Sequence, residues 1–393
     1  MRSIGVYIHI PFCVQKCVYC DFLSAPASGQ RQQEYVAALR REIAQKSGQY
    51  AGYEVQTVFF GGGTPSILDA EGIAEILGCL RKYYRINDTA EMTMEMNPGT
   101  ADADKLLRLK KTGINRLSLG LQSADNAELK LLGRIHTYED FLRTYRLARN
   151  AGFVNINVDL MSALPGQHMQ SWIRTLEKVA ALQPEHISAY SLMIEEGTRL
   201  HDRLDEYPPL PDENEDRLMY QATRRILERE GYQRYEISNY AKEGYECRHN
   251  RIYWQRGVRH TTDYVGFGLG AASMVNHVRW KNTADMEQYL CAFAGDSVVG
   301  DQHTMGKEKV LEDVQKLSKN DRMEEYMFLG LRMMSGVSQL EFAESFGVEM
   351  SDIYGDVLRK WEKQGMLTRK DDYVCLTEAG IDVSNMVLAD FLL

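Results

Sequence analysis

Tyr7-Ile8-His9-Ile10-Pro11-Phe12-Cys13 opens a stretch that continues through Cys17 to Cys20, so three cysteines directly follow a short apolar run. The run from Val6 to Ile10 predicts a buried strand, and Pro11 ends it. The cysteines are therefore expected on a loop at the carboxyl end of a first strand. In barrels of alternating strands and helices, this is the end that carries the chemistry.

The spacing Cys-x3-Cys-x2-Cys indicates an iron–sulfur cluster. A [4Fe-4S] cluster has four irons, so three thiolates bind three of them and leave one iron open for a ligand. A zinc site and a chance grouping are the alternatives. Zinc sites usually combine Cys-x2-Cys with a second Cys or His pair, and no second pair follows within normal reach in a chain with only seven cysteines. The sequence favours the cluster, with Cys13, Cys17 and Cys20 as its ligands.

The first 200 residues alternate apolar strands with amphipathic helices, which predicts an α/β domain with a parallel sheet. One expected helix face carries Tyr35, Val36, Leu39 and Ile43, and another carries Ile73, Ile76, Leu77 and Leu80. Six strands are too few to close an eight-stranded barrel. The predicted strands are 6–10, 57–60, 92–96, 116–119, 155–160 and 187–191.

The cysteine stretch resembles the signature of the radical S-adenosylmethionine (SAM) superfamily. More narrowly, it resembles the branch that contains the oxygen-independent coproporphyrinogen III dehydrogenases and the HemW heme chaperone family. The resemblance implies a partial (β/α)6 TIM-like barrel, a [4Fe-4S] cluster, and SAM bound to the open iron. It also implies a reductant for the cluster and the ability to cleave SAM. Several further motifs in the chain support it.

The resemblance also assigns cofactor-binding residues. Gly61-Gly62-Gly63-Thr64 follows the second predicted strand, and glycines there permit close approach of a ligand to the backbone. The remaining assigned positions lie at strand ends or beside the cluster, and each has a structural role in the scaffold as its alternative. The cofactor-binding positions implied by the resemblance are Tyr7, Tyr19, Gly62, Gly63, Thr64, Glu95, Gln122, Arg134 and Asp159.

Two features separate the branches of the family. The dehydrogenases carry a further cysteine two positions after the third one, whereas Asp21-Phe22 follows Cys20 here. HemW proteins carry His-Asn-x-x-Tyr-Trp, which matches residues 249–254. The resemblance makes His249 a candidate heme-binding residue, and the alternative is a core histidine bonded to its aromatic neighbours. Relatives continue with Gly-Pro-Gly-Ala-His, but this chain has Gly-Leu-Gly-Ala-Ala at 268–272.

Three regions are expected along the chain. Residues 1–206 form the radical SAM core, residues 207–320 form an α+β region that carries the His-Asn-x-x-Tyr-Trp motif, and residues 321–393 form a winged-helix-like domain. A proline-rich stretch at 207–212 marks the first change, and Asp212 is a plausible N-cap of a helix that ends near residue 230. In the last region, helices at 340–346 and 353–364 precede a predicted strand pair at 366–368 and 373–377.

Composition narrows the function. The net charge of −9 argues against a general nucleic-acid binder. The sequence contains no run of 18 apolar residues, so no membrane-spanning helix is expected. Peripheral contact with a membrane remains an open alternative. The reduced cysteine motif favours a cytoplasmic protein. The sequence therefore predicts a radical SAM heme chaperone that passes heme to an unidentified acceptor protein. The alternative is a coproporphyrinogen III dehydrogenase or another radical SAM enzyme acting on a tetrapyrrole, and the absent cysteine predicts that the dehydrogenase activity is lacking.

Overall fold

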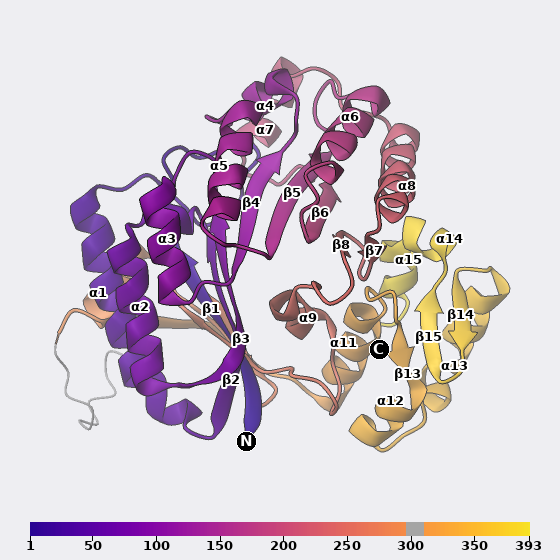
Figure 1. The fold of residues 1–393 in the computed structure, drawn as a ribbon. Helices are drawn as coiled ribbons and strands as arrows, with labels where there is room; N and C mark the ends of the chain where they lie inside the picture. Colours follow the sequence, from indigo (N-terminus) through magenta and orange to yellow (C-terminus); the bar gives the residue numbers. More distant parts are fainter. Residues whose placement is uncertain (296–309) are drawn as a thin grey trace.

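The computed structural model describes residues 1–295 and 310–393, and its main feature is one twelve-stranded sheet (Figure 1). The six central strands are parallel and lie in chain order, so all six predicted strands are confirmed. The strand order has two free edges, so the barrel is open, as the fold class predicted. The central strands are β1 (Arg2–Ile10), β2 (Tyr53–Gly62), β3 (Arg85–Met96), β4 (Arg116–Gln122), β5 (Ile156–Ser162) and β6 (His186–Ser191).

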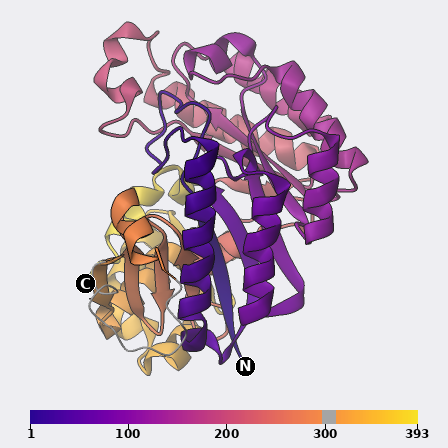
Figure 2. The same cartoon turned by 90° about the vertical axis from the view of Figure 1, so that its left-hand side faces the viewer.

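Helices connect these strands and cover the outer face of the curved sheet (Figures 1 and 2). Their apolar faces follow the helical period, and all eight residues predicted to face the core are buried. Ser28 and Asp69 cap the first two helices through their side-chain oxygens. The covering helices are α1 (Gly29–Lys46), α2 (Ala70–Tyr83), α3 (Ala103–Thr112), α4 (Asn126–Leu131), α5 (Tyr138–Asn150) and α6 (Met169–Ala180), with short 3-10 turns η1 (Ser47–Tyr50) and η2 (Pro65–Ile67).

The region predicted at 207–320 does not form a layer of its own in the described residues. Its strands extend the main sheet at both edges, because β8 pairs with β6 and β9 pairs in parallel with β1. The boundary at 206 is therefore not a boundary of the sheet. The helix predicted after Asp212 is present with that N-cap. The elements are α7 (Arg199–Asp202), η3 (Leu204–Glu206), α8 (Glu213–Arg229), β7 (Gln233–Arg234), β8 (Asn239–Ala241), α9 (Arg248–Trp254), β9 (Tyr264–Phe267), β10 (Ala272–Val275), β11 (Val278–Asn282), α10 (Met286–Ala292) and β12 (Leu311–Lys316).

The C-terminal region has its own small sheet and its own hydrophobic cluster, which contains Tyr326, Phe342 and Trp361. The predicted strand pair is confirmed, and helix, strand, two helices and two strands follow one another in winged-helix order. Figure 1 shows this region beside α8 and α9. It comprises α11 (Lys319–Gly330), β13 (Val337–Ser338), α12 (Gln339–Phe346), α13 (Met350–Lys363), β14 (Leu367–Lys370), β15 (Tyr373–Leu376), α14 (Glu378–Asp382) and α15 (Ser384–Ala389).

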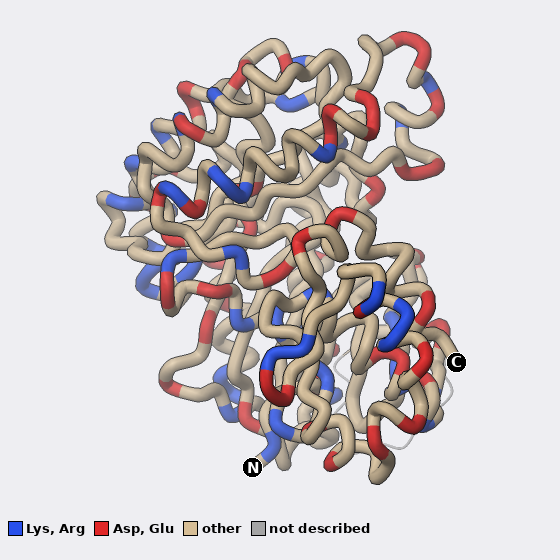
Figure 3. The backbone as a smooth tube through the Cα atoms, turned by 90° about the vertical axis from the view of Figure 1, so that its right-hand side faces the viewer, with Lys and Arg blue, Asp and Glu red and all other residues tan. Residues whose placement is uncertain are grey.

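Charged residues of both signs are interspersed over the side of the molecule that carries the C-terminal region (Figure 3). Among the described residues, no helix combines the length and the apolar character that a membrane crossing requires.

Candidate functional site

A cavity of about 330 Å³ lies at the carboxyl ends of the parallel strands. It brings together eleven of the thirteen site residues predicted from the sequence, and these come from the cysteine loop, from the ends of β2, β3 and β4, from the middle of β5 and from the loop before α5. Only Tyr7 and His249 lie outside its lining. The eleven are Cys13, Cys17, Tyr19, Cys20, Gly62, Gly63, Thr64, Glu95, Gln122, Arg134 and Asp159.

The cysteine loop has no helix or strand, and backbone contacts to distant segments fix its path. The backbone N–H of Cys13 donates to the carbonyl of Ala25 at 3.2 Å, which closes the base of the loop. Further along, the N–H of Val18 donates to Leu132 at 3.2 Å, and the carbonyl of Val18 accepts from Leu200 at 2.8 Å. The loop is therefore held at its base and at its middle, which presents the cysteines to one cavity.

The glycine run after β2 packs against this loop. The N–H of Gly63 donates to the carbonyl of Ile10 at 2.9 Å, and a Cβ on Gly63 would lie 2.5 Å from the carbonyl oxygen of Phe12. Gly62 has a φ of +110°, and a Cβ there would lie 2.5 Å from the ring of His9. Both positions require glycine because the backbone approaches its own chain, in addition to any ligand.

His9 links strand β1 to the far end of the loop. One ring nitrogen lies 2.9 Å from the carbonyl oxygen of Leu23, and the other lies 3.0 Å from the hydroxyl of Tyr7. Tyr7 also stacks on Phe59, with ring centroids 6.3 Å apart. The structure thus places Tyr7 behind the loop, where it supports His9 and does not line the cavity.

The three cysteines fit a cubane cluster. Among residues 1–295 and 310–393, no three His, Cys, Asp or Glu side chains are grouped closely enough to bind a single metal ion. A [4Fe-4S] cluster makes a different demand, because each thiolate binds a different iron. The described lining of the cavity holds three cysteines and neither a fourth cysteine nor a histidine. This donor set leaves one iron of a cubane without a protein ligand.

Two carboxyl groups face the same cavity without a directly bonded cation, although the charge of buried Arg116 acts on both. Glu95 accepts a hydrogen bond from the N–H of Gly62 at 3.3 Å, and Asp159 accepts from Ser118 at 2.9 Å and from Asn157 at 2.7 Å. Burial, with the negative charge of Asp159, raises the pKa of Glu95 to about 8, and burial also raises the pKa of Asp159. In the part of the chain that the structure describes, neither forms an ion pair with Lys, Arg or His. Such a pair fits a cationic ligand, and SAM carries an ammonium and a sulfonium group.

Arg134 connects the cysteine loop to the strand ends. It donates to the Sγ of Cys17 at 3.6 Å and to Asn97 at 2.7 Å, and it also bonds the carbonyl of Gly120. The residue is held by protein groups and places a positive charge beside a predicted cluster ligand. Gln122 adopts a φ of +72° at the end of β4, and its side chain accepts a hydrogen bond from Tyr190 at 3.2 Å.

His249 is a core residue. Its ring nitrogens lie 2.7 Å from Thr57 Oγ1 and 2.9 Å from the hydroxyl of Tyr253, and its ring stacks on Phe59. The side chain is 1% exposed, and burial lowers its pKa to about 3. A heme ligand needs an open ring nitrogen, and neither is open here. The structure therefore favours the alternative of a core histidine, and we do not propose His249 as the heme ligand.

The stretch at 268–272, which departs from the Gly-Pro-Gly-Ala-His expected from the resemblance, follows β9 on the side of β1 away from β2. A Cβ on Gly268 would lie 2.4 Å from the hydroxyl of Tyr35, so this turn packs on α1 and takes no part in the cavity.

The structure adds residues that the sequence analysis missed. Asn97 follows Glu95 at the end of β3, and Tyr190 lies at the end of β6, so the strand-end rule could have identified both. Asn239 and Asn250 also line the cavity but come from β8 and α9. Only the tertiary structure brings these two asparagines to the strand ends.

Comparisons with known proteins agree with this site. Residues 7–179 match the family described as the radical SAM superfamily, and residues 317–383 match the HemN C-terminal domain. Coproporphyrinogen III oxidase (HemN) from Escherichia coli, described as a radical SAM enzyme, has the same fold, with a TM-score of 0.85 and 24% identity over 100% of this chain and 90% of that one. The fold and the cysteine-lined cavity define a radical SAM protein, whose cofactors are a [4Fe-4S] cluster and SAM.

Relatives that match over their full length identify the family within the radical SAM proteins. The heme chaperone HemW of Bacillus subtilis is 33% identical over 99% of both chains. The heme chaperone HemW of Escherichia coli is 34% identical over 100% of this chain and 99% of its own length. The chain belongs to the HemW family.

Proposed function

We propose that this protein is a heme chaperone, which binds heme and passes it to an acceptor protein. The observation that carries the proposal is the full-length similarity to relatives that are named heme chaperones. The similarity to HemN concerns the fold alone, at 24% identity.

We propose the following roles in the cysteine-lined cavity. Cys13, Cys17 and Cys20 bind the cluster, and Arg134 orients Cys17 through the contact between its guanidinium and the sulfur. Glu95 and Asp159 face the cationic groups of SAM. A reduced cluster with bound SAM supplies one-electron cleavage of the sulfonium. The protein positions the two groups and limits the access of water to them.

The glycine run after β2 has a separate role. Gly62, Gly63 and Thr64 pack on the cysteine loop, which would hold their backbone beside the residues that bind the cluster. Tyr19 and Gln122 line the same cavity, where the hydroxyl of Tyr19 is available as a neutral hydrogen-bond donor, and burial raises the pKa of Tyr19 further above its ordinary value.

The alternative function is oxidative decarboxylation of coproporphyrinogen III. It makes a specific demand at position 22, where the dehydrogenases carry a cysteine. Here Phe22 occupies the position, and its side chain is 62% exposed at the mouth of the cavity. A phenyl ring has no thiol to replace that cysteine, so we propose that this chain does not catalyse the decarboxylation.

The partners follow from the same proposal. The cluster needs a one-electron reductant, and the chaperone needs an acceptor protein, either free or at a membrane surface. We propose a cytoplasmic location because cluster thiols are maintained in a reducing compartment.

Two assays on anaerobically reconstituted protein test the function. The first titrates hemin, then mixes the loaded protein with apomyoglobin and follows the Soret band during transfer. The second incubates the protein with coproporphyrinogen III, SAM and dithionite, and separates the porphyrins by chromatography. Saturable hemin binding with transfer, and no decarboxylated product, supports the proposal. Robust decarboxylation without hemin binding would overturn it in favour of the dehydrogenase.

A further inference from the structure

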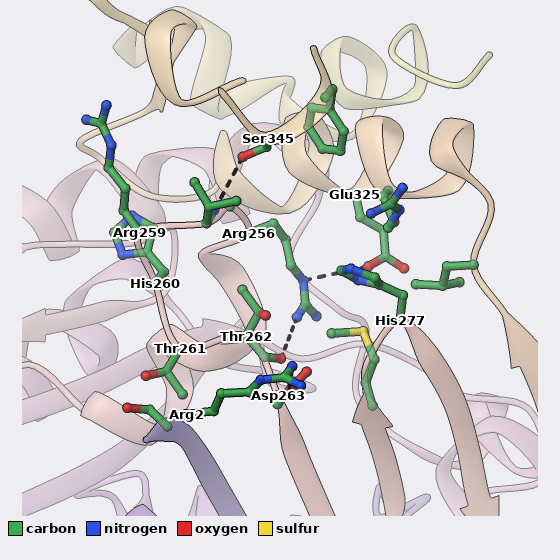
Figure 4. A pocket seen from close by; sticks show the side chains of 17 residues that line it. Arg2, Arg256, Arg259, His260, Thr261, Thr262, Asp263, His277, Glu325 and Ser345 are labelled. Atoms are coloured by element: carbon green, nitrogen blue, oxygen red, sulfur yellow. Dashed lines mark hydrogen bonds and ion pairs between the residues drawn. The ribbon is translucent and has the colours of Figure 1, made fainter. Parts of the chain in front are cut away.

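A second cavity of about 450 Å³ lies at the opposite end of β1, between the sheet and the C-terminal region (Figure 4). Its volume is within the roughly 300–1,000 Å³ typical of small-molecule sites. Its walls come from the start of β1, the loop between α9 and β9, the β10–β11 hairpin, and helices α11 and α12. The comparisons and the predicted site residues leave this cavity without a role.

The cavity contains an incompletely compensated buried cation. The side chain of Arg256 is 9% exposed; its Nη1 donates to the carbonyl of Thr262 at 3.2 Å, and its Nε has no hydrogen-bond partner. The nearest carboxylate oxygen, on Glu325, is 3.6 Å away, and Glu325 also pairs with Arg279. Two guanidinium groups thus share one carboxylate. Figure 4 shows the guanidinium of Arg256 in the middle of the cavity. A buried charge is costly without full pairing, so this arrangement fits an anionic ligand.

A second cation and a free imidazole lie in the same cavity. Arg322 forms no ion pair with any carboxylate in the described ranges, and its Nε bonds only the carbonyl of Ser318, at 3.3 Å. His277 lies in the two-residue turn of the β10–β11 hairpin and reaches toward Arg256 (Figure 4). Within residues 1–295 and 310–393, no hydrogen bond or ion pair engages the ring of His277, in contrast to His249.

Part of the remaining wall is apolar, and the rest carries hydroxyl groups and the carboxylate of Asp263, which pairs with Arg2. Met274 and Leu317 are buried beside the cavity, and Phe346 closes it from α12. The cavity therefore combines an apolar patch, incompletely compensated arginine side chains and an open imidazole. These three features match the three chemical parts of heme, which are an apolar macrocycle, two carboxylates and an iron that accepts an imidazole ligand.

We propose that this cavity is the heme site, with His277 as the iron ligand and with Arg256 and Arg322 as partners of the carboxylates. The proposal rests on the proposed chaperone function and specifies its binding site. The cavity begins at Arg2, and the cysteine loop begins after Ile10, so β1 separates the two sites by about 26 Å at about 3.3 Å per residue. Binding of heme in this cavity is therefore independent of the cluster and of SAM.

The test is a hemin titration on the full-length protein and its variants, monitored by the Soret band. His277→Asn is the main variant, because asparagine tolerates the φ of +63° at this turn and does not replace imidazole as an iron ligand. We expect a shifted Soret band and affinity about tenfold or more lower, which corresponds to the loss of one strong interaction. Arg256→Gln and Arg322→Gln should each lower the affinity for hemin by about tenfold but have little effect on hemin dimethyl ester, which lacks the charges.

Controls separate the possible failures. His201→Asn changes an exposed histidine outside both cavities and should bind hemin as the unmodified protein does. Cys17→Ala should lose the cluster and keep the hemin spectrum.

If the unmodified protein binds hemin and the His277 and arginine variants bind it equally, the cavity proposal is wrong while the chaperone function stands. If only the arginine variants weaken binding, the cavity binds anions without iron ligation, which also overturns the proposal. If the unmodified protein fails to bind hemin, the chaperone function itself is lost.

Discussion

Replacing Gly63 by alanine should damage the cluster site through a clash with the protein backbone. The added Cβ would lie 2.5 Å from the carbonyl oxygen of Phe12 and 2.9 Å from its carbon. Phe12 directly precedes Cys13, and backbone atoms cannot move aside as a flexible side chain can. The clash must therefore displace either the glycine run or the first cluster ligand.

The magnitude follows from two contributions. Overpacking of this kind costs about 1–3 kcal/mol. The displacement also strains the hydrogen bonds from Gly63 to Ile10 and from Thr64 to Phe12, at 2.9 and 2.7 Å, each worth about 1 kcal/mol. We expect a free energy of unfolding lower by about 2–4 kcal/mol.

Iron and sulfide content after anaerobic reconstitution, together with a denaturant melt of the cluster-free protein, measures both effects. Gly78→Ala is the matched control, because this position lies within α2 with no atom within 4 Å of the added Cβ. It should keep its iron and gain up to about 1 kcal/mol from helix propensity. A Gly63→Ala protein with unmodified stability and full iron content would refute the reasoning.

Three further predictions concern single side chains. His249→Ala should lower the free energy of unfolding by about 3 kcal/mol, because Thr57 and Tyr253 lose their buried hydrogen-bond partner. The same variant should leave the Soret band of bound hemin unchanged. A shifted Soret band without loss of stability would make His249 a heme ligand. Cys17→Ala should abolish most of the cluster, as iron analysis and the loss of the spectral response to SAM would show; full cluster content would remove Cys17 from the ligand set. Glu95 has a folded-state pKa of about 8 against an ordinary 4.5, so the cluster-free folded protein retains a proton that the unfolded chain releases, and its stability should fall as pH rises between these values. Glu95→Gln should flatten that part of the pH profile in denaturant melts, and an unchanged slope would contradict the assignment.

Local patterns in the sequence predicted most of the sheet and most of the site. The six parallel strands are recognisable because each is a short apolar run bounded by turn residues, and all six are present. Glu95 and Gln122 could be placed at the cavity because parallel strands carry their carboxyl ends to one edge. The strand pair at the C-terminus was likewise predicted from its own residues.

Short and irregular segments limited the prediction. Strands β7 to β12 are two to six residues long and add to both edges of a sheet formed by residues far away in the sequence. A local sequence pattern does not identify their partner strands, so residues 207–320 read as a separate region in the sequence. The same long-range pairing brings Asn239 and Asn250 to the cysteine-lined cavity.

The sequence alone determined the chemistry of the cluster, because three cysteines within eight residues carry their spacing in the chain itself. It also determined the family, because the motif residues are consecutive or nearly so. Tertiary structure decided what the histidines do. His249 belongs to a conspicuous motif, yet Thr57 of β2 and Tyr253 of its own helix engage its two ring nitrogens. His277 has no motif around it, yet its hairpin turn leaves its ring open beside Arg256. Whether an imidazole is available to iron depends on which groups surround it, and only the folded chain specifies those neighbours.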